Sequence, residues 1–356
     1  MVRYNAVSGG GTVCIVVFTQ KGIVFFMSWF IFALICLLGW GGADLFYKKG
    51  TDSDDRYSHL KIAVWVGLVM GVVALVLLPF SETGFSVASL LENAVKYSPA
   101  SLAYIISMVI GYAGLRYLEV SIVSPVQNAS GAFSMIAMMV YFAITGTVND
   151  ELGDFSPLNI IGTAIIVVGM VILAIVENSL ARKEANELSG TEEEKKKNRK
   201  YQFGALALLF PILYCIFDTV GTAADGIILN EETGLGLGEI DVLILYGLTF
   251  LLAGIIAWIY MLIRTKKPYN PFAVKELANK GVAACFEEFG QVFYVFAMAR
   301  KPVLAAPMVA SYCIVSVILS RIFLKEKLKA SQYACVIAVI VGIVCLGIAE
   351  GLGEAE

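Results

Sequence analysis

Four acidic residues lie inside otherwise apolar stretches of the sequence, where a charged group is costly. They are Asp44, Asp218, Glu287 and Glu288. Insertion scales put an acid at the centre of a bilayer at roughly 2.5–3.5 kcal/mol, so such residues are rare and are paired or functional. Carboxylates in this setting bind protons or balance a positive charge, which is the chemistry that these four residues predict.

Asp44 and Asp218 share the same local pattern. Trp40 precedes Asp44 by four residues, and Tyr214 precedes Asp218 by four, so in a helix each ring lies on the same face as its acid. This repetition predicts a paired site for a cation or a proton. The alternative is a structural acid held by backbone donors and hydroxyl groups, and Asp44 is close enough to Lys48 to reach the membrane surface.

Glu287 and Glu288 are adjacent, and a polar stripe follows them. Gln291 comes four residues after Glu287 and Tyr294 comes seven after it, which places the three on one helix face. Two neighbouring carboxylates in a low dielectric cannot both stay ionised cheaply, so we expect one to hold a proton part of the time. In the alternative, the two side chains face opposite ways, one toward a neighbour's hydroxyl group and one toward water.

Two further stretches place polar groups after a proline. Gln127 and Asn128 follow Pro125, and Tyr312 follows Pro307. Serines recur around them at intervals of three to four residues: Ser124, Ser130, Ser134, Ser316 and Ser320. Each proline frees the carbonyl group four residues earlier, so these segments are expected to line a polar pathway. Hydrogen bonding between helices is the alternative.

The sequence gives little support to enzymatic chemistry. His59 is the only histidine, and the seven cysteines form no CxxC pair, so we expect neither a His-based triad nor a metal centre in the apolar stretches. A phosphate-binding GxxxxGK[ST] sequence is also lacking. We therefore expect no catalytic residues, no cofactor and no metal. The net charge of −3 gives no bias toward nucleic acid.

The elements that must position these residues are membrane helices. Hydrophobic residues make up 58% of the 356 residues and charged residues only 15%, with a mean hydropathy of +0.79. About 20 apolar residues are needed to cross a bilayer. Ten runs meet this requirement: 28–47, 60–80, 100–117, 120–146, 157–177, 201–224, 240–263, 280–299, 303–323 and 332–350.

The two halves of the chain repeat. The segment that contains Trp40 and Asp44 aligns without gaps with the segment that contains Tyr214 and Asp218, and Pro125 aligns with Pro307. Each half holds five spans, so the second half enters the membrane from the opposite side. The fold class predicted is an all-α polytopic membrane protein with ten transmembrane helices in a 5+5 inverted repeat, a layout typical of secondary transporters.

The predicted organisation has four parts. Residues 1–27 form an N-terminal lead, which either precedes a true start at Met27 or is dispensable. They are followed by the first repeat at 28–177, a charged linker at 178–200 and the second repeat at 201–351. The short apolar run at 12–26 is interrupted by Lys21 and lacks the pattern of a signal peptide; a surface helix is the alternative. Acids followed by bases in the linker favour a solvated helix.

The sequence also resembles a known family. The motifs that carry the resemblance are 297–307, 323–328, Gln332 and 342–343 in the second half, and 114–118, Pro125, Gly162 and Gly169 in the first. They resemble EamA-like transporters of the drug/metabolite transporter superfamily over about 28–350. The resemblance implies ten helices in a 5+5 inverted repeat and carrier-type transport of small organic solutes. The polar residues described above are not part of the shared pattern, so the resemblance does not supply the substrate.

Basic residues predict the orientation. Loops on one side carry 21 Lys and Arg, and those on the other side carry 5. Because basic loops stay in the cytoplasm, the linker 178–200 is expected inside and both termini outside. Members of the resembled family are usually drawn with both termini inside, so the two arguments conflict, and we give the count more weight.

These observations predict a secondary transporter in the plasma membrane. Acids outnumber bases in the spans, so the solute is expected to be cationic or zwitterionic, with proton coupling open. Arg116 and Arg300 lie at span ends and leave amino acids as candidates. The expected partners are the small-molecule substrate and the lipid bilayer, in a monomer or a homodimer. A non-transporting membrane scaffold or sensor on the same fold is the alternative.

Overall fold

The computed structural model describes residues 16–19, 22–25, 28–52, 55–82, 84, 86–118, 120–147, 156–187, 207, 209–230, 234–235, 237–325 and 328–353. Within these residues, ten helices or helices in series are long and apolar enough to cross a membrane, as the hydropathy predicts. Helices suit these apolar runs because lipid offers no hydrogen bonds, and a helix satisfies its backbone groups internally.

Five spans belong to the first half of the chain. They are α1 (Trp29–Gly50), α2 (Ser58–Leu77) with the short η1 (Leu78–Phe80), α3 (Val87–Gly114), α4 (Val120–Asn128) continued by α5 (Ser130–Thr145), and α7 (Pro157–Glu187). Helix α3 begins well before the predicted start at 100. The Ser86 hydroxyl accepts a bond from the Ser89 amide and caps it, and Pro99 is accommodated inside it.

Five spans follow in the second half. They are α9 (Leu209–Ile228), α10 (Glu239–Thr265), α11 (Val274–Glu276) with the π-turn η4 (Leu277–Gly281) and α12 (Val282–Arg300), α13 (Pro302–Ala310) with α14 (Tyr312–Leu319) and the π-turn η5 (Ser320–Leu324), and α15 (Ala330–Gly353). Helix α9 runs four residues past the predicted end at 224. Residues 201–206, at the predicted start of this span, lie outside the described residues.

The fourth and ninth spans are interrupted at equivalent places. Helices α4 and α5 meet at Ala129, four residues after Pro125, and α13 and α14 meet at Ser311, four residues after Pro307. The amide of Ser311 bonds to the carbonyl of Met308, three residues back instead of four. The prolines therefore mark local breaks in helices that otherwise span the membrane.

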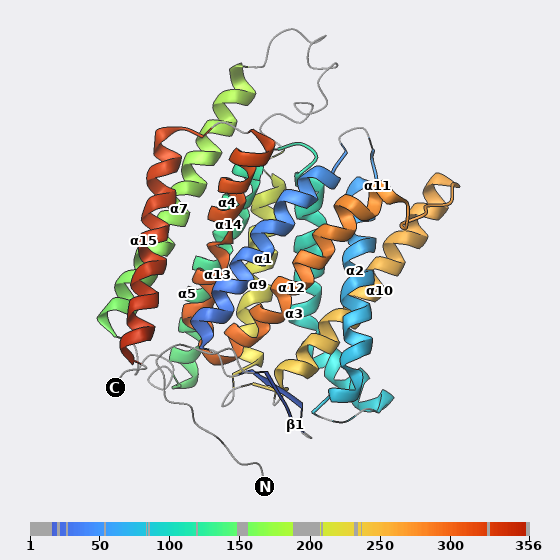
Figure 1. Ribbon diagram of the computed structural model, residues 1–356, viewed down its shortest axis with the longest axis horizontal. Coiled ribbons are helices and arrows are strands. Elements are labelled where there is room, and N and C mark those ends of the chain that lie inside the picture. Colours follow the sequence, from blue (N-terminus) through green and yellow to red (C-terminus); the bar gives the residue numbers. More distant parts are fainter. Residues whose placement is uncertain are drawn as a thin grey trace.

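Helix pairing crosses from one half to the other. The second span α2 packs on the seventh, α10, and the fifth, α7, packs on the tenth, α15 (Figure 1). The first span α1 packs on the eighth, α12, and the third, α3, on the sixth, α9. If the spans of the two halves are exchanged, the α2–α10 and α7–α15 pairs are unchanged, and the α1–α12 pair becomes the α3–α9 pair. This reciprocity is what an inverted repeat requires, and the repeat itself stays a prediction.

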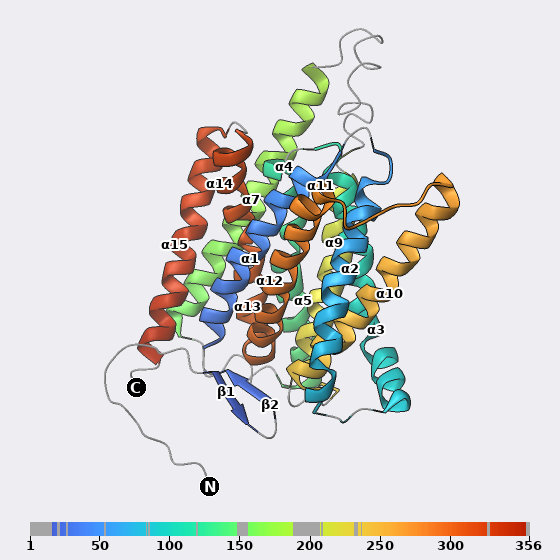
Figure 2. The same cartoon turned by 45° about the vertical axis from the view of Figure 1, so that its right-hand side comes forward.

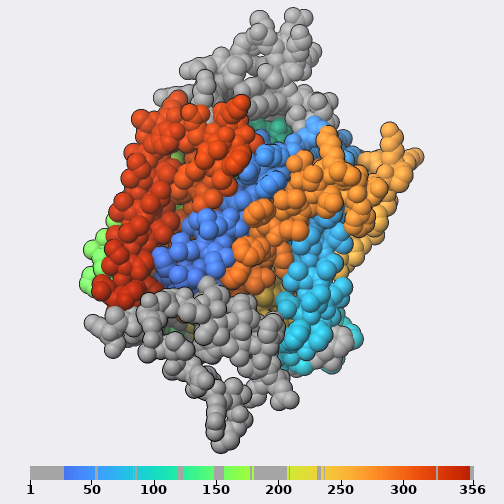
Figure 3. Space-filling view, in the orientation of Figure 1, coloured from blue at the N-terminus to red at the C-terminus, as the bar shows by residue number. Residues whose placement is uncertain are grey.

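The first and last described helices are tied at one end of the bundle. Helix α1 begins and α15 ends at the same end, and the Trp29 indole donates to the Glu350 carboxylate at 2.6 Å. Beside this end lies a hairpin of β1 (Val16–Thr19) and β2 (Gly22–Phe25), antiparallel with Val16 opposite Phe25 (Figure 2). The apolar run at 12–26 thus contributes strands over part of its length. On the face shown in Figure 3, α1 lies between α12 and α15.

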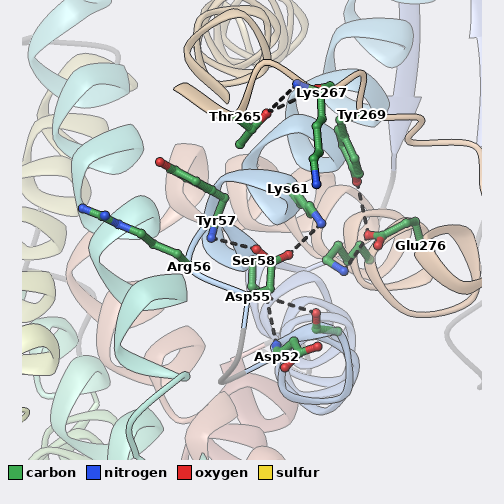
Figure 4. A network of polar contacts seen from close by, with 12 residues as sticks. Asp52, Asp55, Arg56, Tyr57, Ser58, Lys61, Thr265, Lys267, Tyr269 and Glu276 are labelled. Carbon is green, nitrogen blue, oxygen red and sulfur yellow. Dashed lines mark hydrogen bonds and ion pairs between the residues drawn. The ribbon is translucent and has the colours of Figure 1, made fainter. Parts of the chain in front are cut away.

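At the opposite end of the bundle, a polar network joins α2 to α11 and the connection before it (Figure 4). Lys61 pairs with Asp55 at 2.6 Å, and its ammonium lies over the Tyr269 ring. The Tyr269 hydroxyl donates to Glu276, which pairs with Lys280 at 2.6 Å. The charged linker beyond Glu187, at 188–200, lies outside the described residues.

Candidate functional site

A buried cavity occupies the middle of the bundle, where α1, α3, α9 and α12 meet the two interrupted spans. Its volume is about 40 Å³, enough for water but far below the roughly 300 Å³ or more of a typical ligand pocket. Residues on both sides of the helix breaks line it: Asn128 and Ser130 in one span, Ala310 and Tyr312 in the other. The prolines therefore place the helix interruptions at the cavity wall.

Most of the polar residues singled out from the sequence converge on this cavity. It is lined by Trp40, Asp44, Gln127, Asn128, Tyr214, Asp218, Glu287, Tyr294 and Tyr312. Glu288 and Gln291 do not line it. The polar stripe on α12 is thus divided. Glu287 and Tyr294 line the cavity, while Gln291 is buried outside its wall, and within the described part of the chain its amide nitrogen has no hydrogen-bond partner.

Asp44 is held by one serine from each half of the chain. The hydroxyl of Ser124 on α4 donates to its Oδ2 at 2.7 Å, and the hydroxyl of Ser316 on α14 donates to the same oxygen at 2.6 Å. Lys48, one turn further along α1, donates instead to the carbonyl groups of Leu115 and Leu118. Asp44 therefore takes part in the cavity and not in a lysine pair at the helix end.

Asp218 occupies the equivalent place on α9. The Ser130 hydroxyl donates to its Oδ2 at 2.5 Å. Ser130 belongs to α5 in the first half, so this bond again crosses between the halves. Asp218 is only 7% exposed, and a hydroxyl donor is a weaker compensation than a positive charge.

Glu287 is bound by a chain of phenols. Tyr47 donates to its Oε2 at 3.2 Å, and Tyr112 donates to the Tyr47 oxygen at 3.2 Å. The Trp40 indole donates to the Glu287 backbone carbonyl at 3.2 Å, which fixes the ring against α12. Glu287 is thereby connected to α1 and α3, whereas Glu288 makes no hydrogen bond to the described residues.

Aromatic rings form much of the remaining wall. Trp40 contacts Tyr294 and Tyr312, with ring centroids 5.1 and 5.5 Å apart, and the Tyr214 hydroxyl contacts the Met108 sulfur. Among the described residues that line the cavity, none is basic. Three acids surrounded by aromatic rings and hydroxyl groups form an environment suited to a positively charged guest or to protons.

The cavity also contains residues that the sequence reasoning missed, chiefly Tyr47, Tyr104, Tyr112 and Thr222. Tyr47 follows Asp44 by three residues, and this spacing places both side chains on one helix face, so the sequence does indicate that they lie together. Asp225 was missed because the predicted sixth span ended at 224, although it lies seven residues after Asp218 and so on the same helix face. Asp225 is fully buried just beyond the cavity.

One family model matches part of the second half of the chain. Residues 233–348 match the EamA-like transporter family. This family is part of the drug/metabolite transporter superfamily, as the motifs in the sequence indicate. The ten apolar helices indicate a multi-pass membrane protein, and over the matched segment the chain is similar to transporters of the EamA-like family.

One solved structure extends the comparison beyond the matched segment. It is described as "Crystal structure of protein" and is similar over 91% of this chain and 98% of its own, with a TM-score of 0.52 and 13% sequence identity. At this identity the likeness concerns the fold alone. No curated protein matches the sequence.

Proposed function

We propose that the protein is a secondary carrier that moves a small cationic or zwitterionic organic solute across the plasma membrane. The observation that supports this most is the convergence of Asp44, Asp218 and Glu287 on one buried cavity, with no basic residue among the described lining residues. Buried carboxylates without a counter-charge are unfavourable, so the site gains most from a positive guest or from protons.

The wall suggests what the guest is like. The rings of Trp40, Tyr214 and Tyr312 present π-faces and edges of the kind that bind ammonium groups. Gln127 is 5% exposed and lines the cavity, and its amide nitrogen has no hydrogen-bond partner among the described residues. That nitrogen is a donor for a carboxylate, which keeps amino acids among the candidates. Arg116 and Arg300, the bases considered from the sequence, do not line the cavity.

The cavity must widen for such a guest to enter. Its volume of about 40 Å³ has room for water-sized molecules only. Asp44 and Asp218 each accept a hydrogen bond from a serine of the other half. A cationic group that enters between the halves competes for these carboxylate oxygens, and protons compete in the same way. We therefore include exchange of the solute against protons in the proposal.

Transport into proteoliposomes tests the proposal directly. The probes are radiolabelled tetramethylammonium, putrescine and lysine, which present a quaternary ammonium group, two primary ammonium groups and an amino acid with a cationic side chain. We expect saturable uptake of at least one probe above protein-free liposomes, increased by a pH gradient. Uptake of none of them, with no probe raising the thermal stability of the purified protein, would favour the non-transporting scaffold or sensor instead.

Amide variants then locate the site. Asp218→Asn and Glu287→Gln keep size and hydrogen bonding but remove the charge, so each should weaken uptake of a cationic probe by about 10- to 100-fold, the equivalent of a charged hydrogen bond. Glu288→Gln is the matched variant on the same helix that does not line the cavity, and it should leave uptake unchanged. If Glu288→Gln impairs uptake and Glu287→Gln does not, the assignment of the cavity acid is wrong.

A further inference from the structure

A second acid site lies next to the cavity, built from residues of four helices. Asp225 on α9 has no exposed surface. Tyr97 of α3 donates to its Oδ1 at 2.5 Å, while Tyr246 of α10 and Tyr294 of α12 donate to its Oδ2 at 3.1 and 2.9 Å. Edge-to-face contacts between Tyr97 and Tyr246, and between Tyr104 and both Tyr246 and Tyr294, pack the rings around the carboxylate.

No positive charge compensates this acid. Among the described residues, no Lys, Arg or His contacts Asp225, and its hydrogen bonds come from phenols alone. Helices α4, α5 and α13 also pack against α9, and their sequences contain no charged residue. The titratable groups that face Asp225 are the four tyrosines and Asp218, which lies two turns away on the same helix.

Phenol groups are unusual partners because they serve both protonation states. A hydroxyl group donates to an ionised carboxylate, and by rotating it accepts from a protonated one. A backbone amide or an ammonium group can only donate, so it would hold the acid in its ionised form. We propose that Asp225 is a proton-binding site of this protein, reached from the central cavity through Tyr294.

The geometry provides the route. Tyr294 lines the cavity and also donates to Asp225, so its hydroxyl connects the two. A proton from cavity water binds the Tyr294 oxygen while the original hydroxyl proton passes to Oδ2 of Asp225. The carboxylate gains one proton, the phenol stays neutral and the water donor loses one, so the step is balanced.

The site also joins the two halves of the chain. Tyr97 belongs to the first half, and Asp225, Tyr246 and Tyr294 belong to the second. A hydrogen bond to an ionised carboxylate is about twice as strong as one to a neutral acid. Protonation therefore weakens the contact of α3 with α9 at this end of the bundle. This part of the inference rests on the proposed function, because it assumes that the two halves separate during transport and that protonation of Asp225 permits the separation.

Infrared difference spectroscopy tests proton binding without any solute. Spectra of the full-length protein in liposomes are compared between acid and alkaline pH. Subtracting Asp225→Asn from wild type should leave the carbonyl band of a protonated carboxyl group together with tyrosine ring bands. Asp241→Asn is the matched control, because Asp241 is also buried but accepts from a serine, Ser81, and should leave no tyrosine bands.

Two conservative variants keep the test decisive if Asp225→Asn does not fold. Tyr97→Phe and Tyr246→Phe retain the rings and remove one hydroxyl each, so each should shift the carboxyl band. Absence of the band in the wild-type minus Asp225→Asn spectrum overturns the proposal. A band that neither phenylalanine variant moves overturns it as well.

Transport separates this inference from the proposed function. The probe is the one among tetramethylammonium, putrescine and lysine that the wild type accumulates. When a pH gradient drives uptake, Asp225→Asn should accumulate this probe at least tenfold less than the wild type. It should retain exchange of labelled for unlabelled probe. If the wild type moves none of the three, the proposed function fails while the infrared result still decides on the proton site. If Asp225→Asn accumulates the probe as wild type does, only this inference fails.

Discussion

The crossing of α2 with α10 gives a sharp test of the packing between the two halves. A Cβ atom added at Gly67 would lie 3.0 Å from the Cα atom of Gly254 and in contact with the carbonyl oxygen of Phe250. Both are backbone atoms, so no flexible side chain can move aside. Gly351 near the end of α15 is the matched control, because nothing lies within 4 Å of its added Cβ.

The expected magnitude follows from comparing the two alanine variants. Each gains up to about 1 kcal/mol of helix propensity, so the difference between them isolates the steric cost at Gly67. Overpacking typically costs about 1–3 kcal/mol, and a contact with backbone belongs in the upper half of that range. At roughly 2 °C per kcal/mol for a large chain, Gly67→Ala should unfold about 4–6 °C below Gly351→Ala.

Thermal unfolding of both variants in the same detergent measures this difference. The heating rate must be kept the same, because unfolding of a protein of this kind is commonly irreversible and its midpoint depends on the rate. Equal midpoints would show that α2 and α10 are not in close contact at Gly67. The reciprocal pairing of the halves would then lose one of its main contacts.

Three further predictions concern the ends of the bundle. With native cysteines removed, an impermeant thiol reagent on intact cells should label a cysteine at Gly234 and not one at Ser189; the reverse would overturn the predicted orientation. Deleting residues 2–26 should leave expression and transport intact, and loss of membrane insertion would show that the lead is structural. Burial raises the pKa of Asp55, but bonds from Lys61 and a backbone amide outweigh it and leave the pKa below its ordinary 3.8. Because the pKa of Asp55 is lowered by folding, its ionised form stabilises the folded state above about pH 4, and this stabilisation is lost as the acid protonates. Lys61→Met should therefore lower the thermal unfolding midpoint at neutral pH, and the midpoints of variant and wild type should converge in acid.

Much of the architecture could be predicted because it depends on local properties of the sequence. Length and apolarity define the ten spans, and two of them are interrupted four residues after a proline, Pro125 in one and Pro307 in the other. The pairing of Trp40 with Asp44 also depends only on helical periodicity. These features need no knowledge of which helices become neighbours.

The rest of the site depends on which helices meet, and the sequence does not reveal this. Tyr97 and Tyr246 are separated by 149 positions and look like ordinary aromatic residues until both contact Asp225. The orientation of α12 is another example: periodicity places Gln291 on one face with Glu287, but Glu287 lines the cavity and Gln291 does not. Such choices follow from how helices pack and not from the pattern along one helix.

The two halves are alike in scaffold but differ in their acids, and this difference gives the site a direction. In the gap-free alignment that places Asp44 over Asp218, Thr51 occupies the position of Asp225. The Thr51 hydroxyl donates to the backbone carbonyl of Tyr47, so it closes a helix end and offers no proton site. The predicted repeat thus pairs two carboxylates, Asp44 and Asp218, that line the cavity, while among the described residues the acid with three phenol donors, Asp225, belongs to the second half. If both proposals hold, solute binds between the halves and the proton binds on one side of the cavity. Such an arrangement would distinguish the two ends of the pathway even if the two sets of helices are repeats of one another.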